Sequence, residues 1–89
     1  MADEQDVPAW DPDAVQVEYV YVAVANHIAL RIEAGQLKPG NPLPGERALA
    51  EEYGIALGTV RRAIELLRDR GVVVTLPAKG TYVKPQDNG

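Results

Sequence analysis

Two adjacent arginines, Arg61 and Arg62, are the residues of this chain whose type and placement suggest a chemistry. A guanidinium group is permanently charged and presents its N–H donors in a planar fork that suits phosphates and base edges. A third basic residue, Lys79, precedes Gly80 in a short turn. No Ser/His/Asp set or phosphate-binding loop is present, and the single histidine, His27, has no cysteine or second histidine to join it. The residues therefore predict no enzyme, no cofactor and no metal site.

The arginines lie in residues 43–71, LPGERALAEEYGIALGTVRRAIELLRDRG, which have the pattern of a helix-turn-helix. The pattern predicts helices over about 46–53 and 58–70, the second ended by Gly71. Gly54 falls at the turn, where φ > 0 is needed and a β-carbon would add strain. Small Ala50 falls at the closest approach of the helices. Apolar residues at helical spacing predict the inward faces: Leu49, Tyr53, Ile55, Val60, Ala63, Ile64 and Leu67.

The flanking sequence predicts a further helix before this run and a hairpin after it. Residues 15–18 are expected to be extended and residues 19–34 helical, with Gly35 as the helix stop. The Val-rich segment 72–84 predicts strands 72–76 and 81–84 around a turn at 77–80. Three helices followed by a two-stranded β-hairpin wing define an α+β fold, the winged helix-turn-helix. The expected organisation is a flexible acidic arm (1–14), the folded domain (15–84) and a frayed tail (85–89).

The distribution of charge along the chain is uneven. The chain has 89 residues, enough for one small domain, and a net charge of −4. Residues 1–29 contain six acidic residues and no Lys or Arg, whereas residues 30–89 contain nine basic residues and seven acidic ones. The predicted winged helix-turn-helix domain is thus mildly basic and follows an acidic arm. Cysteine is absent, the start does not resemble a signal peptide, and no apolar stretch is long enough to span a membrane, so we expect a cytoplasmic protein with no membrane partner.

Simpler roles compete with functional ones for several side chains. An adjacent arginine pair on a helix is usually a solvated surface, but its occurrence with the turn, the apolar pattern and the hairpin favours DNA binding. Trp10 is expected to pack on its own domain, with a role as a dimerisation anchor as the alternative. His27 is expected to be structural or exposed. Tyr19 and Tyr21 are expected in the core or at its rim.

The chain resembles the GntR family of bacterial transcription regulators over about residues 21–83. The phrase LPGERALA at 43–50 is similar to the family's LPSER-x-LA signature, and KGTYV at 79–83 is similar to its GKGTFV. Further matches occur in register: Tyr21, Ile28, Ile32, the run GQLKPG at 35–40, Gly54, Ile55, the run TVRRA at 59–63, Leu67, Arg70 and Gly71.

The resemblance implies which residues contact DNA. Arg47, at the start of the second helix, and Thr59 and Arg61, on the recognition helix 58–70 in the major groove, match contact positions. Arg61 is the expected base reader and Thr59 a phosphate contact. Lys79 and Gly80 match the tip of the wing 77–80, which enters the minor groove in the family. The full predicted DNA-binding set is Arg47, Leu57, Gly58, Thr59, Arg61, Arg62, Lys79, Gly80 and Thr81.

This sequence departs from the family pattern at several of these positions. Ala56 lacks the side-chain oxygen that usually caps the recognition helix, and Gly45 replaces a serine. Leu57 stands where the family commonly has arginine, and either contacts a thymine methyl group or covers the local core. Gly58 replaces a polar phosphate contact, and Ala78 stands where the family favours glycine.

The resemblance implies a sequence-specific transcription regulator, a repressor, that binds a palindromic operator in double-stranded DNA as a homodimer. No C-terminal effector domain follows residue 84, so no small-molecule effector site is expected within this chain. The start at Met1 and the polar end favour a natural minimal regulator over an excised domain. The alternative is a winged helix used for protein–protein interaction or assembly, which the acidic arm and the departures at Leu57 and Gly58 favour.

Overall fold

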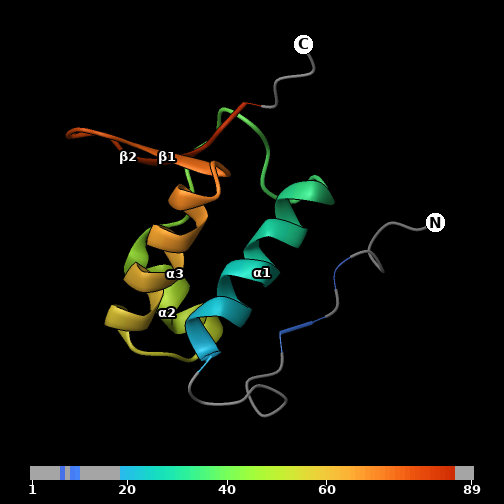
Figure 1. Ribbon diagram of the computed structural model, residues 1–89, viewed down its shortest axis with the longest axis vertical. Coiled ribbons are helices and arrows are strands. Elements are labelled where there is room, and N and C mark those ends of the chain that lie inside the picture. The colour runs from blue at the N-terminus through green and yellow to red at the C-terminus, as the bar shows by residue number, and fades with distance from the viewer. Residues whose placement is uncertain (1–6, 8, 11–18, 86–89) are drawn as a thin grey trace.

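Three helices are followed by an antiparallel hairpin in the computed structural model, which describes Val7, Ala9, Trp10 and residues 19–85 (Figure 1). The elements in chain order are α1 (Val20–Glu33), α2 (Glu46–Tyr53), α3 (Leu57–Asp69), β1 (Val73–Leu76) and β2 (Gly80–Val83). This order confirms the predicted winged helix-turn-helix. The extended segment predicted at 15–18 lies outside the described residues, as do most of the arm and tail.

The limits of α1 and α3 differ from the predicted ones by one residue. Tyr19 and Ala34 are the caps of α1 and not part of it. Helix α3 begins at Leu57 because Ala56 is extended and its carbonyl accepts the amides of Thr59 and Val60, at 3.0 and 3.1 Å. It ends at Asp69 instead of residue 70, before Gly71 with a φ of 76°. The predicted α2 is correct, with Gly45 as its N-cap.

The turn between α2 and α3 has the geometry that the sequence predicts. Gly54 has a φ of 68° and its amide donates to the carbonyl of Ala50. The amide of Ile55 donates to the same carbonyl at 3.1 Å. A left-handed residue at this point stops α2 and redirects the chain toward α3, which a residue with a β-carbon would do at a cost.

An isolated β-bridge joins the segment before α2 to the hairpin, which the sequence did not predict. Pro42 pairs with Tyr82 of β2 in an isolated antiparallel bridge. On either side of it, the amide of Val83 donates to Asn41 and the amide of Leu43 donates to Thr81, both at 2.8 Å. Proline has no amide hydrogen and is tolerated at a sheet edge, which is where Pro42 lies. The link between α1 and α2 is therefore fixed to the wing.

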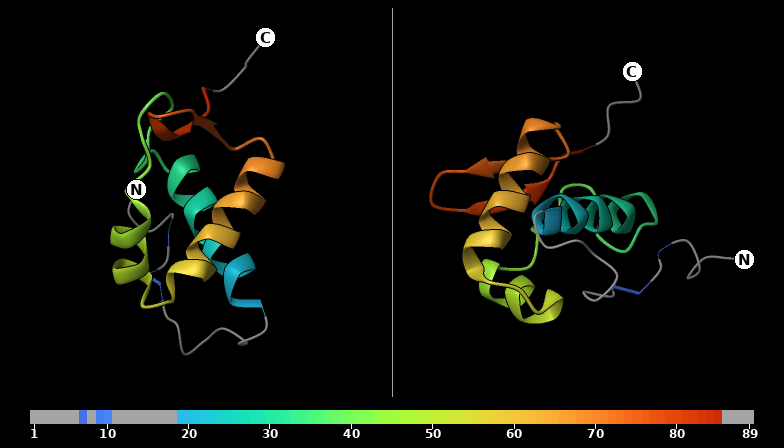
Figure 2. Two further views of the ribbon diagram at one scale, coloured as in Figure 1. Left: turned by 90° about the vertical axis from the view of Figure 1, so that its left-hand side faces the viewer. Right: turned by 60° about the horizontal axis from the view of Figure 1, so that its bottom comes forward.

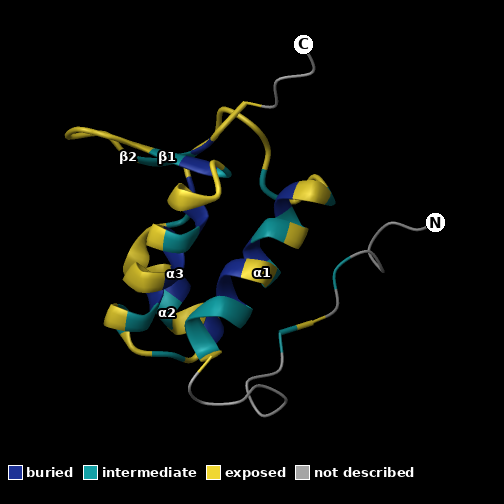
Figure 3. Ribbon diagram, in the orientation of Figure 1, coloured by how far each residue is buried: buried dark blue, intermediate teal, exposed yellow. Residues whose placement is uncertain are grey.

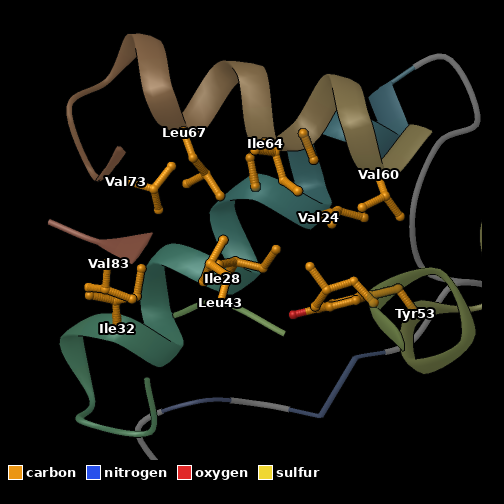
Figure 4. Packing of buried hydrophobic residues seen from close by; sticks show 13 residues of the cluster. Val24, Ile28, Ile32, Leu43, Tyr53, Val60, Ile64, Leu67, Val73 and Val83 are labelled. Atoms are coloured by element: carbon orange, nitrogen blue, oxygen red, sulfur yellow. The ribbon is translucent and has the colours of Figure 1, made fainter. Parts of the chain in front are cut away.

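The core lies between α1, α2, α3 and the inner face of the hairpin (Figures 2 and 3). Figure 4 shows α3 and α1 packed through Val60, Ile64, Val24 and Ile28, with Tyr53 closing one end. The buried side chains are Val24, Ala25, Ile28, Ile32, Leu43, Leu49, Tyr53, Val60, Ala63, Ile64, Leu67, Val73 and Val83.

Two of the expected core positions have different outcomes. Tyr21 is half-buried against the core, as expected. The prediction for Tyr19 is wrong, because its side chain is 58% exposed. Tyr19 precedes the first turn of α1 as its N-cap, so it lies off the inward-facing stripe of the helix.

Among the residues that the structure describes, Tyr53 is the largest fully buried side chain, and its hydroxyl is hydrogen-bonded. The hydroxyl pairs with Nδ1 of His27 at 2.8 Å and accepts from Nη1 of Arg31 at 3.2 Å. The Arg31 guanidinium group also contacts the carboxylate of Glu52 at 3.2 Å. Burial raises the pKa of Tyr53 above its ordinary value, and the charge of Arg31 only partly opposes this. Burial opposes the charge of Arg31, but Tyr53 and Glu52 together raise the pKa of Arg31.

The raised pKa of Tyr53 predicts a loss of stability at alkaline pH. An unfolded tyrosine titrates near pH 10.0, so the folded protein keeps this proton where the unfolded chain has lost it. The contribution of protonated Tyr53 to the free energy of unfolding is complete below pH 10 and disappears as the pH rises through the higher folded pKa. Tyr53→Phe should cost about 1 kcal/mol at neutral pH through the lost hydrogen bonds.

Between about pH 9 and pH 11, Tyr53→Phe should lose less unfolding free energy than the wild type, as measured by urea denaturation. Tyr19→Phe, which alters an exposed ring, is the matched control and should follow the wild-type curve. Equal alkaline losses in all three proteins would contradict the assignment.

The tip of the hairpin contains a strained residue. Ala78 has a φ of 62°, and it is the one non-glycine residue with positive φ in the described part of the chain. The amide of Lys79 donates to the carbonyl of Leu76 at 3.0 Å, so Pro77 and Ala78 are the central residues of a turn. Proline followed by a residue with φ > 0 is the pattern of a type II turn, which favours glycine at the second position. The register pairs Leu76 with Gly80, so the loop is one residue shorter than predicted.

Ala78→Gly should stabilise the domain. Relief of a left-handed alanine gains about 1–2 kcal/mol, and the greater freedom of glycine in the unfolded chain offsets about 0.4–1 kcal/mol of that. We expect a net gain of about 0.5–1 kcal/mol in urea denaturation. The reverse control, Gly80→Ala at a φ of 105°, should destabilise. A loss of stability in Ala78→Gly would show that the turn does not have this geometry.

Candidate nucleic-acid interface

The face of α3 directed away from α1 is exposed and carries most of the charge of this helix (Figure 3). Gly58, Arg61, Glu65 and Arg68 recur at intervals of three and four residues, which places them on one side of the helix. The opposite side contributes Val60 to the core. This face therefore carries charges of both signs, with the acidic Glu65 between Arg61 and Arg68.

Arg61 is joined to the first residue of α2. Its Nε donates to Oε1 of Glu46 at 3.0 Å, and both side chains are largely exposed, at 62% and 44%. An exposed pair of this kind contributes at most about 1 kcal/mol to stability. Its effect is geometric: it holds the side chain of Arg61 against the start of α2. The N–H donors on the terminal nitrogens of the guanidinium group are not used by this contact.

Arg62 follows a different direction from its neighbour. Its guanidinium carbon lies 4.4 Å above the ring centroid of Tyr21 on α1. A stacked cation of this kind is attracted by the negative face of the ring. Arg62 is exposed but held over α1, so the two adjacent arginines do not act as a single basic patch.

A surface groove lies between the start of α2 and the wing. Arg47 borders it from α2, Lys79, Gly80 and Thr81 border it from the hairpin, and Ile64 of α3 also lines it. The predicted residues of the second helix and the wing are therefore close together in space. Glu46 lines the same groove, and through it Arg61 is connected to this side of the molecule.

Arg68 links α3 to the wing, a role that the sequence did not predict. Its Nη1 donates to the hydroxyl of Thr75 at 2.8 Å, and that hydroxyl lies 3.0 Å from the hydroxyl of Thr81. Thr75 and Thr81 are directly opposite each other in the hairpin. The available signal was the spacing, since Arg68 follows Arg61 by two helical turns on the same face.

The first turn of α3 contains the remaining predicted contacts. Leu57 and Thr59 are half-buried and Gly58 is exposed. Ala56 provides no side-chain cap, as the sequence predicted. Partial burial of Leu57 is compatible with either of its two proposed roles.

The structure thus gathers Arg47, Lys79, Gly80 and Thr81 around one groove. Arg61 contacts Glu46, which lines this groove, and Arg62 is directed toward α1. None of the described helices is long and apolar enough to cross a membrane. In the described residues, no group of three or more His, Asp or Glu side chains is placed to hold a metal ion.

The fold and the arrangement of the groove define a winged helix-turn-helix protein. Residues 20–83 match the family described as bacterial regulatory proteins, gntR family. The chain belongs to the GntR family, which comprises regulators and not enzymes.

Two curated relatives illustrate this similarity. YieP of Escherichia coli K12, an uncharacterized HTH-type transcriptional regulator, is 41% identical over 75 residues, which cover 84% of this chain and 32% of that protein. NagR of Bacillus subtilis 168, an HTH-type transcriptional repressor, is 38% identical over 68 residues, which cover 75% of this chain and 28% of that protein. The chain therefore spans about a third of the length of the curated relatives that it matches.

A solved DNA complex has the same fold. The structure of AraR(DBD) in complex with operator ORX1 superposes with a TM-score of 0.69 at 27% identity, over 80% of this chain and 83% of that chain. The family and the winged helix-turn-helix fold that the sequence indicated are both confirmed.

Proposed function

We propose that this chain is the DNA-binding domain of a cytoplasmic transcription repressor that recognises a specific operator. Helix α3 lies in the major groove, and the tip of the hairpin lies in the adjacent minor groove. The observation that carries the proposal is the concentration of basic groups from three elements on one side of the molecule. Arg47 and Lys79 border one groove, and Arg61 contacts Glu46 at its edge.

The chemistry of each side chain suggests its role. Arg61 offers the terminal N–H donors of its guanidinium group to a guanine, a pairing that contributes about 1–3 kcal/mol of discrimination. Arg47 and Lys79 neutralise phosphates on either side of the α3 face, which gives affinity without sequence information. Gly58 and Gly80 have no side chain, so they allow the DNA backbone to approach closely.

The relatives support both the target and the direction of control. AraR(DBD) was crystallised with its operator, and NagR is named as a repressor. We propose that two copies of the present protein bind a palindromic site, because two-fold DNA sites match two-fold protein assemblies.

Protein–protein association is the second candidate function. The net charge of −4 and the acidic residue within the α3 face, Glu65, favour it. Titration with mixed-sequence duplex DNA distinguishes the two functions. Binding that weakens steeply with salt supports the repressor, and absence of binding at low salt supports the association module.

Arg61→Ala should weaken binding to the selected operator by about tenfold or more and relax the sequence preference at one base pair. Selection from random duplexes followed by fluorescence anisotropy measures both effects. Arg62→Ala is the matched control, since it removes the same charge from the neighbouring residue stacked on Tyr21. It should weaken all duplexes alike. An unchanged sequence preference in Arg61→Ala would refute the assignment of the base reader.

Lys79→Ala should weaken operator and unrelated duplexes to a similar extent. Loss of one phosphate contact should reduce the slope of log K against log[salt] by about 1. Lys38→Ala, which removes an exposed lysine from the turn after α1, is the control and should leave the slope unchanged. The wing has no contact with phosphate if Lys79→Ala keeps the wild-type slope.

A further inference from the structure

Trp10 makes a set of specific contacts although it lies outside residues 20–83, which match the family. Its indole N–H donates to the backbone carbonyl of Tyr53 at 2.8 Å. Tyr53 is the last residue of α2, and the last carbonyls of a helix have no partner within that helix. Trp10 therefore satisfies an acceptor at the end of α2 from a distant part of the chain.

The ring of Trp10 completes a cluster of three aromatic rings. Its centroid lies 5.0 Å from that of Tyr53 and 5.6 Å from that of His27, and the latter two lie 5.4 Å apart. All three pairs are edge-to-face, an arrangement that aromatic rings favour. The ring packs against the core and is half-buried. Its packing on its own domain is the outcome expected from the sequence.

The position of this cluster determines what it can control. Tyr53 immediately precedes Gly54, whose left-handed backbone sets the direction of the chain from α2 to α3. The side chain of Tyr53 is held by His27 and Arg31 of α1, and its carbonyl by Trp10. The end of α2 is thus held both by α1 and by Trp10. We call the described N-terminal residues Val7, Ala9 and Trp10 the strap; they are the blue part of the trace in Figure 1.

We propose that the strap is a clamp on the helix-turn-helix, in which Trp10 is a positioning residue for DNA binding. Docked Trp10 fixes the end of α2 and so the orientation of α3 relative to Arg47 and the groove. This inference rests on the proposed function for its effect on DNA, but the clamp itself acts in the free protein. By linkage, if the docked strap favours DNA binding, DNA must favour the docked strap to the same extent.

The first test measures the clamp without DNA. Amide hydrogen exchange of Gly54 and Ile55, which both donate to Ala50, should accelerate about tenfold in Trp10→Ala. Trp10→Phe keeps a ring and loses the N–H donor, so its exchange rates should lie between those of the wild type and those of Trp10→Ala. Ile32→Val is the matched control, because it removes volume from a buried side chain of α1 but keeps His27 and Arg31, the partners of the Tyr53 hydroxyl, and should leave these two amides unaffected. If the amides of Gly54 and Ile55 exchange at the wild-type rate in Trp10→Ala, the clamp is overturned.

The second test measures DNA affinity at a temperature at which every variant is folded. Trp10→Ala should bind the selected duplex three- to tenfold more weakly, with partial rescue in Trp10→Phe and no change in Ile32→Val. Trp10 is the only tryptophan, so its fluorescence reports docking directly. Acrylamide quenching of wild-type Trp10 should decrease when DNA is added.

Unchanged or increased DNA affinity in Trp10→Ala overturns the positioning role. Failure of the wild type to bind any duplex at low salt overturns the proposed function instead. In that case the exchange measurement still decides whether the clamp exists.

Discussion

The burial of Tyr53 at the end of α2 is the contact on which the rest of the structure depends. Its ring closes one end of the core, and its hydroxyl is held by two residues of α1 one helical turn apart, His27 and Arg31. Since the next residue is the left-handed Gly54, fixing Tyr53 also fixes the start of the path to α3. The helix-turn-helix is therefore not an independent unit, because the end of α2 is held by residues of α1 and by Trp10.

The second constraint is the way in which the wing is attached. The bridge between Pro42 and Tyr82 joins the hairpin to the segment before α2, and Arg68 joins it to the far end of α3. These contacts hold Lys79 and Arg47 across one groove instead of leaving the hairpin as a free projection. A chain of 89 residues forms only a small core. Here polar contacts between elements complete the positioning of the surface that carries the basic groups.

Local sequence signals were sufficient to predict the helices and strands, but they did not predict the long-range contacts. The limits of α2, the left-handed Gly54 and the inward face of α3 follow from spacing and from the conformational freedom of glycine, which are properties of neighbouring residues. Three contacts join residues far apart in sequence, so no local pattern indicates them: the bridge between Pro42 and Tyr82, the stacking of Arg62 on Tyr21, and the hydrogen bond from Trp10 to Tyr53. Arg61 and Arg62 are adjacent residues of the same type, and the fold gives them different partners.

The central claim is that α3, the start of α2 and the tip of the wing form a single DNA-binding surface. A titration of the ¹⁵N-labelled protein with a duplex selected from a random pool, followed by amide chemical shifts, tests it most directly. The amides of residues 57–62, of Arg47 and of residues 79–81 should shift together and saturate at one stoichiometry, whereas those at the exposed Leu30 on α1 should not. Shifts confined to α1, or none at low salt, would contradict it.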